Sequence, residues 1–289
     1  MEDVLRKPTI PYTMGRRLRV QSHITPSPTP VTFGCGRNDP AGRKERSLLT
    51  PFDRCVQNAP LPGKLGTRIV DLRILAPIRV GDGHSAQVFL AETSENQSVH
   101  KGKKIVVAKV YDPLYFDDLK GSLNPFLCVD RHYTHEVHTY DLLAEFQGGL
   151  IPEFYGSFSL DLSGSGSKVR TVRLILIEQI PGPSMLQVKP EDFSQQCRQQ
   201  IIKSAIDFES MAYHRHIALN HLSPRNIMLL DPSDYPQRKI VFLDFGGTIF
   251  GRRLGGSDDD LFPGQYISPL LRWNWDMAMQ FSDWIDWEF

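Results

Sequence analysis

The sequence predicts an α+β fold in two parts, with a strand-rich N-terminal part and a C-terminal part that begins with a long helix. Before Gly182, short apolar or alternating runs typical of strands are broken by glycine and polar clusters, with one helical stretch among them. After Gly182, Ser194 can cap an amphipathic helix that runs to about His216, and two short strands follow. The strand-like runs are 74–77, 87–91, 105–110, 150–158, 172–177, 227–230 and 240–243, and the first helical stretch is 132–146.

The composition is that of an ordinary soluble protein. The 289 residues are 40% hydrophobic and 23% charged, with a net charge of zero, so we do not expect a nucleic-acid partner or a membrane partner. No apolar run approaches the roughly 18 residues needed to cross a bilayer, and no secretory signal is visible. The four cysteines form no C-x-x-C pair, which argues against zinc and dithiol chemistry. A cytoplasmic or nuclear location is the expectation.

The first 66 residues differ from the rest of the chain. They hold 9 of the 21 prolines and 11 Lys/Arg against 5 Asp/Glu, a net charge of +6, with no periodicity. We therefore expect residues 1–66 to form a disordered basic tail, residues 67–178 the N-terminal lobe, and residues 179–289 a hinge and the shortened C-terminal lobe. A solvated tail is the plain interpretation, and contact of its arginines with an acidic partner is the alternative.

A glycine-containing segment, Gly-Asp-Gly-His-Ser-Ala-Gln-Val at residues 81–88, lies between two predicted strands. Gly81 and Gly83 have no Cβ, so the backbone there can approach phosphate oxygens closely. The apolar Val88 that follows could cover the flat face of a nucleobase. Taken alone, the segment is better explained as a plain hairpin turn.

A lysine ends an apolar strand at Val-Ala-Lys, residues 107–109. Ammonium groups avoid burial unless they are paired, so Lys109 needs a partner. Glu136, in the middle of the next predicted helix, is the candidate, and a triphosphate would give this lysine a function. The alternative is a lysine at a strand end whose ammonium group reaches water.

Two further segments place polar groups beside short apolar strands. Asn226 precedes the strand at 227–230, and its carbonyl oxygen suits a hard cation such as Mg²⁺. Arg225 offers a positive charge near phosphate. Asp244 follows the strand at 240–243 within Asp-Phe-Gly, where a carboxylate is well placed to hold Mg²⁺. Taken alone, each segment is an ordinary loop or a chance match.

In their order along the chain, these segments resemble the signature set of protein kinases: glycine-rich loop, Val-Ala-x-Lys, helix glutamate, catalytic loop ending in asparagine, then Asp-Phe-Gly. The resemblance covers about residues 69–246. Segments 126–135, 175–182, 223–226 and 263–269 also resemble kinase-like proteins of filamentous fungi. The fold implied is the two-lobed protein-kinase-like fold, and the ligand implied is Mg-ATP.

The resemblance also implies roles for individual residues. The glycine loop would cover the phosphates, the lysine–glutamate pair would hold them, and main-chain groups of the hinge would meet the adenine edge. The residues implied to contact nucleotide are Gly81, Gly83, Val88, Lys109, Glu136, Glu178 and Ile180, and those implied to hold Mg²⁺ are Asn226 and Asp244.

The chain departs from the kinase pattern at His221. Aligned on Asn226, His221 stands where the catalytic-loop aspartate would orient the acceptor hydroxyl and receive its proton. A neutral imidazole can accept a proton near pH 7, but it is bulkier and carries no negative charge. A weak phosphotransferase or a pseudokinase is the expectation, with Arg225 supporting the γ-phosphate charge. The alternative is an active ATP-dependent phosphotransferase on a protein or small-molecule acceptor.

The C-terminal segment is the second departure, because only 43 residues follow Gly246 and no A-P-E motif occurs. All four tryptophans (Trp273, Trp275, Trp284 and Trp287) lie within the last 17 residues. We expect this segment to dock onto the C-terminal lobe. A protein partner bound by the tryptophans is the alternative.

Overall fold

A computed structural model of the chain describes residues 7–31, 36–95, 103–116, 122–164, 167–231, 233, 239–251 and 279–285. The chain divides into two compact units, which are described separately. Unit 1 is Met1–His138 with Glu153–Gln179, and unit 2 is Thr139–Pro152 with Ile180–Phe289. The helices are α1 (Pro40–Leu48), α2 (Pro51–Gln57), α3 (Pro125–Leu142) and α4 (Gln195–His214). The strands are β1 (Arg17–Ile24), β2 (Lys64–Arg79), β3 (Gln87–Glu95), β4 (Lys104–Tyr111), β5 (Phe154–Ser163), β6 (Val169–Glu178), β7 (Ile217–Ala218), β8 (Ile227–Leu229), β9 (Ile240–Phe242) and β10 (Ile249–Phe250).

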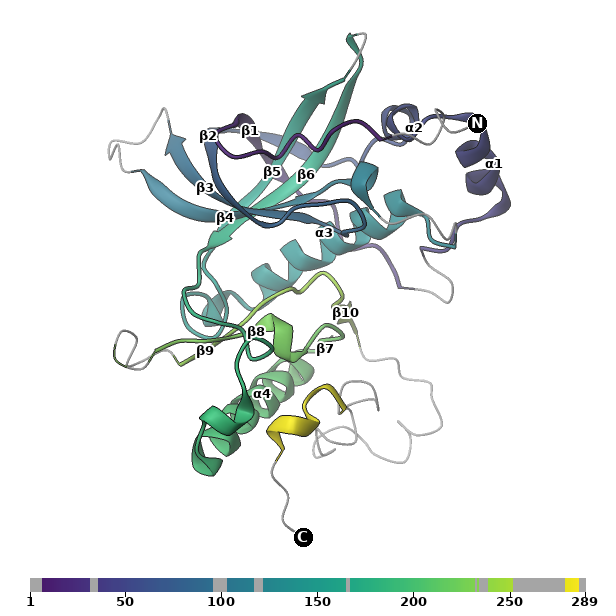
Figure 1. The fold of residues 1–289 in the computed structure, drawn as a ribbon. Coiled ribbons are helices and arrows are strands. Elements are labelled where there is room, and N and C mark those ends of the chain that lie inside the picture. Colours follow the sequence, from purple (N-terminus) through teal and green to yellow (C-terminus); the bar gives the residue numbers. More distant parts are fainter. Residues whose placement is uncertain are drawn as a thin grey trace. The chain divides into compact units, whose positions relative to one another are not determined.

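Unit 1 is built on a closed, six-stranded antiparallel barrel in the order β1-β2-β3-β4-β6-β5 (Figure 1). The barrel closes because β1 pairs with both β2 and β5. Side chains alternate between its interior and its outer face. The interior is filled by fully buried apolar side chains that include Val20, Val70, Phe89, Ala108, Phe158 and Leu174.

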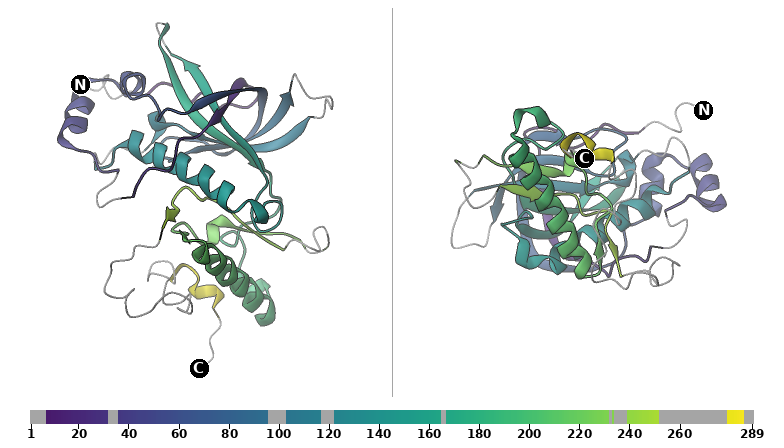
Figure 2. Two further views of the ribbon diagram at one scale, coloured as in Figure 1. Left: turned by 180° about the vertical axis from the view of Figure 1, so that it is seen from behind. Right: turned by 90° about the horizontal axis from the view of Figure 1, so that it is seen from below.

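The N-terminal segment is not the disordered tail expected for residues 1–66. In β1, Leu18 and Val20 point into the barrel core while Arg17 and Arg19 stay exposed, and Val20 pairs with Val70 of β2. The two helices that follow are each capped, α1 by Asp39 and α2 by the side chain of Thr50. Both views of Figure 2 place these helices beside one end of the barrel. The short strand β1, whose pairing with β2 shifts register between Gln21 and His23, therefore lies in a segment that is otherwise rich in proline.

The predicted two-lobed, kinase-like fold with a helical C-terminal lobe is wrong. Unit 1 is a closed barrel and not an open strand-rich lobe, because the strand from the N-terminal segment fills the gap between β2 and β5. Only four α-helices occur in the described residues, and α4 is the one that lies wholly within unit 2. The rest of the described part of unit 2 is made of two-stranded sheets, short 3₁₀ turns and loops.

A buried ion pair holds one end of the barrel together. Asp112 and Arg170 are almost fully buried, and both guanidinium nitrogens of Arg170 donate to the carboxylate, at 2.6 and 2.8 Å. The hydroxyl of Tyr12 donates to the same carboxylate at 2.6 Å. Burial raises the pKa of Tyr12, so this hydroxyl keeps its proton. The pair therefore ties the N-terminal segment to the ends of β4 and β6.

Unit 2 contains the predicted long helix and strand pair. Ser194 caps α4 by accepting the Cys197 amide at 3.2 Å, and the helix buries an apolar face that includes Ile201, Ala205 and Phe208. The ring of Phe208 stacks on Phe242 of β9 at 4.2 Å between centroids. β8 and β9 pair antiparallel. These contacts make a small core under the loops that carry the candidate site residues of this unit.

Within the described residues, no helix combines the length and the apolar character that crossing a membrane requires.

The first prediction concerns the buried ion pair. Arg170→Met leaves the Asp112 carboxylate buried without its cation, so we expect it to lower the free energy of unfolding by about 3–5 kcal/mol. Arg19→Met is the matched control, because Arg19 also donates twice to a carboxylate, that of Asp71, but its side chain is 68% exposed. The control should cost less than about 1 kcal/mol. Chemical denaturation measures both, and equal losses would contradict the structure.

The second prediction concerns Asp130 of α3, whose carboxylate accepts the Leu61 amide. Burial raises the pKa of Asp130 from 3.8 to about 6. The Asp130 carboxyl loses its proton near pH 4 in the unfolded chain and near pH 6 in the folded chain. Its contribution to the free energy of unfolding is therefore fully present below pH 4 and is lost as the pH rises through 6. Asp130→Asn should therefore stabilise the protein by about 1–2 kcal/mol at pH 7.5 and have little effect at pH 4.

The opposite sign is expected for Asp53→Asn. Hydrogen bonds from Lys168 and Thr50 lower the pKa of Asp53, so its carboxylate favours folding at pH 7.5 and this contribution is lost as the pH falls below 4. Thermal unfolding of both variants across this pH range measures the difference. Parallel profiles for the two variants would show that burial of Asp130 is not what shifts its pKa.

Candidate functional site

The glycine segment of unit 1 is a turn between the paired strands β2 and β3. The amide N–H of Gly81 donates to Oε1 of Gln87 at 2.8 Å, and the side-chain amide of Gln87 donates back to the Gly81 carbonyl at 2.7 Å. Gly83 has φ +84°, and its N–H donates to the Tyr115 carbonyl at 2.9 Å. A phosphate would have to displace Gln87 and Tyr115 to reach these two amides.

Lys109 and Glu136 form the buried pair that their positions in the sequence suggest. The Lys109 Nζ lies 2.6 Å from Glu136 Oε2, and the two side chains are 9% and 1% exposed. Tyr111 donates its hydroxyl to the same oxygen at 2.7 Å. Lys109 and Tyr111 lie on the outer face of β4, and Glu136 lies on α3. The carboxylate therefore fixes an ammonium group in a position set by a strand and a helix.

Val88 lies directly opposite Lys109 in the antiparallel register of β3 and β4, so the two side chains share the outer face of the barrel. Val88 is half-buried. Glu178 is the last residue of β6, and its N–H and carboxylate both bond to the backbone of Glu153. Ile180 belongs to unit 2. The predicted hinge therefore coincides with the boundary between the two units, which falls after Gln179.

In unit 2, His221, Asn226 and Asp244 lie close together. Asn226 is buried, and its amide nitrogen donates to the His221 carbonyl at 2.8 Å, which leaves Oδ1 as the amide atom that could bind a cation. The carbonyl of Asn226 accepts the Leu243 amide at 2.8 Å. Because β8 and β9 pair, the residues that precede β8 and follow β9 are neighbours.

Asp244 occupies an unusual backbone conformation, with φ +65° in the left-handed region. A non-glycine residue there is strained, and such strain clusters at functional sites. Its Oδ2 lies 3.7 Å from His221 Nδ1, and the two side chains are 21% and 32% exposed. The strand and the strained backbone together direct a carboxylate and an imidazole to one partly exposed place.

The neighbours of Asp244 hold it in position. Phe245 is buried and meets Tyr140 edge-on, with ring centroids 5.4 Å apart. Gly247 lies against the His221 ring so closely that a Cβ on it would be 2.3 Å from the ring atoms. Only glycine allows this approach. The Asp-Phe-Gly segment is thus anchored by an aromatic core, and a second glycine fixes the imidazole.

Arg225 is exposed on the 3₁₀ turn Pro224–Asn226. Trp284 is 4% exposed and packs on Phe193, with ring centroids 5.4 Å apart. For this tryptophan the expected docking within the C-terminal half is confirmed. The other three tryptophans, and the segment 263–269, lie outside the described residues.

The described residues contain no group of three or more His, Cys, Asp and Glu side chains that could hold a metal ion by themselves. Asp244 and Asn226 still fit Mg²⁺, which prefers oxygen ligands and is usually bound by one or two carboxylates together with water and substrate phosphates. One carboxylate and one carboxamide oxygen would require phosphate oxygens to complete the shell. The donor set therefore suits a metal that arrives with a phosphorylated ligand.

Three of the residues that shape these sites were not singled out from the sequence. Gln87 holds the glycine turn, Tyr111 is the second donor to Glu136, and Gly247 positions His221. The alternation of β4 places Tyr111 on the same face as Lys109, which is a signal that sequence could have supplied. The roles of Gln87 and Gly247 depend on loop conformations that no local pattern reveals.

No protein-family model matches the chain, and no curated protein sequence matches it.

Proposed function

We propose that the protein binds a magnesium nucleotide such as Mg-ATP and transfers phosphate weakly or not at all. The observation that carries the proposal is Asp244, a carboxylate held in a strained left-handed conformation beside His221 and Asn226. Strain at a partly exposed carboxylate is costly for the fold and is expected where the group binds something.

The buried pair in unit 1 is the second support. An ammonium group with three donors suits phosphate oxygens, and the Glu136 carboxylate holds the Lys109 side chain in a fixed position. A purely structural ion pair would explain the same contact. The two explanations differ in one respect, because only a phosphate-binding lysine affects ligand affinity when its charge and that of its partner are removed together.

His221 accounts for weak transfer. General base catalysis contributes about 10²–10⁴-fold to a rate. Phosphoryl transfer depends mainly on positioning and on charge stabilisation, so nucleotide binding does not require the base. A histidine at this position lacks the negative charge that an aspartate would carry. A neutral imidazole can still accept a proton. Exposed Arg225 supplies a positive charge on the same loop for the terminal phosphate.

A cytoplasmic or nuclear location stays a prediction, and so does the absence of a nucleic-acid partner. The acceptor of any transferred phosphate is proposed only as a class, a protein or a small molecule.

The third prediction concerns ATP binding and is measured by thermal-shift titration of the full chain, with separate variants in unit 2 and in unit 1. With Mg²⁺ present and ATP at 100 times its Kd, the free energy of unfolding of the wild type should rise by about 2.7 kcal/mol. It should rise much less with Mg²⁺ or ATP alone. In unit 2, Asp244→Asn should remove the magnesium-dependent part. Asp207→Asn is its control, because Asp207 pairs with Lys203 on the exposed surface of α4 and should not affect the shift.

In unit 1, the double variant Lys109→Met, Glu136→Gln removes both charges together and keeps an acceptor for Tyr111, so the fold should tolerate it. Its ATP-induced shift should disappear. Arg54→Met is the control, because it removes a cation whose side chain is 4% exposed and which also pairs with a glutamate. A full ATP shift in the double variant would leave Lys109 with a structural role only.

The fourth prediction concerns turnover. His221→Asp restores a carboxylate next to Asn226, so phosphate release or transfer from ATP should rise by about 10²-fold or more over wild type. His221→Asn is the control without a charge, and its rate of phosphate release or transfer should not rise above that of wild type. Radiolabelled ATP with Mg²⁺ or Mn²⁺ measures both. If His221→Asp stays at the background of the Lys109→Met, Glu136→Gln variant, His221 does not stand at the position of a catalytic base.

A further inference from the structure

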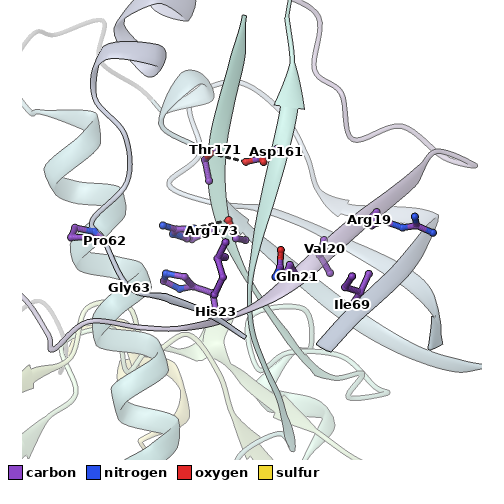
Figure 3. Close-up of a pocket in the computed structure, with 12 residues that line it drawn as sticks. Arg19, Val20, Gln21, His23, Pro62, Gly63, Ile69, Asp161, Thr171 and Arg173 are labelled. Carbon is purple, nitrogen blue, oxygen red and sulfur yellow. Dashed lines mark hydrogen bonds between the residues drawn. The ribbon is translucent and has the colours of Figure 1, made fainter. Parts of the chain in front are cut away.

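A pocket of about 490 Å³ lies on the outer face of the barrel, beside β1, β5 and β6 of unit 1 (Figure 3). Its size is within the range of small-molecule sites. Lys109 and Glu136 do not line it. The polar side chains that matter for its chemistry are Gln21, His23, Ser159, Asp161, Thr171 and Arg173. None of these was assigned a role by the nucleotide proposal.

Arg173 forms no direct salt bridge with a carboxylate among the described residues, although the carboxylates of Asp130 and Asp161 lie near enough to raise its pKa. One of its terminal nitrogens donates to Ser159 Oγ at 2.6 Å, and the other donates to the Leu61 carbonyl at a long 3.3 Å. Its Nε is buried and has no hydrogen-bond partner. The half-buried guanidinium therefore donates only to neutral oxygens, and desolvation lowers its pKa by more than the nearby carboxylates raise it.

His23 lies beside Arg173 and adds no second charge. The ring is 3% exposed, and its Nδ1 lies 2.8 Å from the Tyr133 hydroxyl. That hydroxyl accepts a hydrogen bond from Thr25, so its own hydrogen is available for Nδ1. Burial and the neighbouring guanidinium lower the pKa of His23 to about 4, so the ring is neutral at pH 7.

In this tautomer the other ring nitrogen, Nε2, carries the hydrogen, and it is buried without a partner. Figure 3 shows the side chains of His23 and Arg173 directed toward the Pro62–Gly63 segment. Neither unsatisfied nitrogen is exposed to water, so a ligand oxygen would first meet the terminal nitrogens of Arg173.

The other charges around the pocket are already engaged. Arg19 donates twice to Asp71, and Asp161 accepts the hydroxyl of Thr171 at 2.7 Å. Asp161 is exposed, and the strand register places it diagonally from Arg173. Leu65 and Ile69, 60% and 45% exposed, give the rim an apolar part. The pocket thus combines a cation without a direct salt bridge, one exposed carboxylate, neutral hydrogen-bonding groups and an apolar rim.

We propose that this pocket binds the carboxylate or phosphate group of a small organic molecule, with Arg173 holding the oxyanion and Leu65 and Ile69 covering the apolar body. The oxyanion takes the hydrogen bond that Arg173 now gives to the Leu61 carbonyl. The site is separate from the nucleotide groups, so it survives if the nucleotide proposal fails.

The test titrates the full chain with three probes: phenyl phosphate, inorganic phosphate and benzyl alcohol. Imidazole resonances of labelled histidine, with His23 assigned through His23→Gln, report binding next to Arg173. We expect saturable shifts of the His23 signal, with phenyl phosphate tighter than inorganic phosphate and benzyl alcohol weakest. Arg173→Met should weaken the affinity for phenyl phosphate by about tenfold or more. Arg173→Lys, which keeps the charge, should weaken it by a few fold.

Three variants serve as controls. Lys168→Met should change the affinity by less than about threefold, because its exposed ammonium pairs with Asp53 and does not line the pocket. Asp161→Asn removes a repelling charge and should tighten binding. The Lys109→Met, Glu136→Gln variant should bind phenyl phosphate like wild type. Unchanged affinity in both Arg173 variants, equal binding of benzyl alcohol and phenyl phosphate, or phenyl phosphate binding that leaves the His23 signal unmoved would overturn the proposal.

Discussion

The buried contact between the Lys109 ammonium and the Glu136 carboxylate links the fold of unit 1 to its proposed chemistry. A carboxylate that is only 1% exposed requires a cation, and the 2.6 Å contact supplies one from β4. The contact also fixes the helix that carries Glu136 against the outer face of the barrel (Figures 1 and 2). A layer of aromatic rings between the barrel and this helix continues from the contact to the pocket beside Arg173. The ring centroids of Tyr111 and Tyr133 are 5.5 Å apart, and those of Tyr133 and His23 are 5.9 Å apart.

The barrel makes this layer possible. Because β1 pairs on both sides, the sheet has no open edge, and its strands hold outward-facing side chains in a fixed register. In unit 2, other elements hold a charged side chain in a fixed position. There, a short strand pair and an aromatic core hold Asp244 in a strained conformation. Both units therefore place charged groups on rigid elements, as recognition of a charged ligand requires.

The sequence predicted the elements with strong local patterns. The cap at Ser194, the strand with Lys109 and the pairing of Lys109 with Glu136 were all confirmed. It did not predict the barrel, because β1 is eight residues long, carries exposed arginines and owes its conformation to partners distant in the chain. The pocket beside Arg173 was missed for the same reason. Arg173 appears in the sequence as one of many outward-facing strand residues, and only the structure shows that it forms no direct salt bridge within the described part of the chain.

The central claim, that the chain binds a nucleotide together with magnesium, is tested most directly by calorimetric titration of the whole protein with ATP. One titration contains Mg²⁺, and the other contains a chelator. We predict saturable binding with Mg²⁺ and an affinity at least about tenfold weaker without it, because Asp244 and Asn226 supply too few oxygens to hold the metal without phosphate. Absence of saturable heat, or equal affinity under both conditions, would contradict the account.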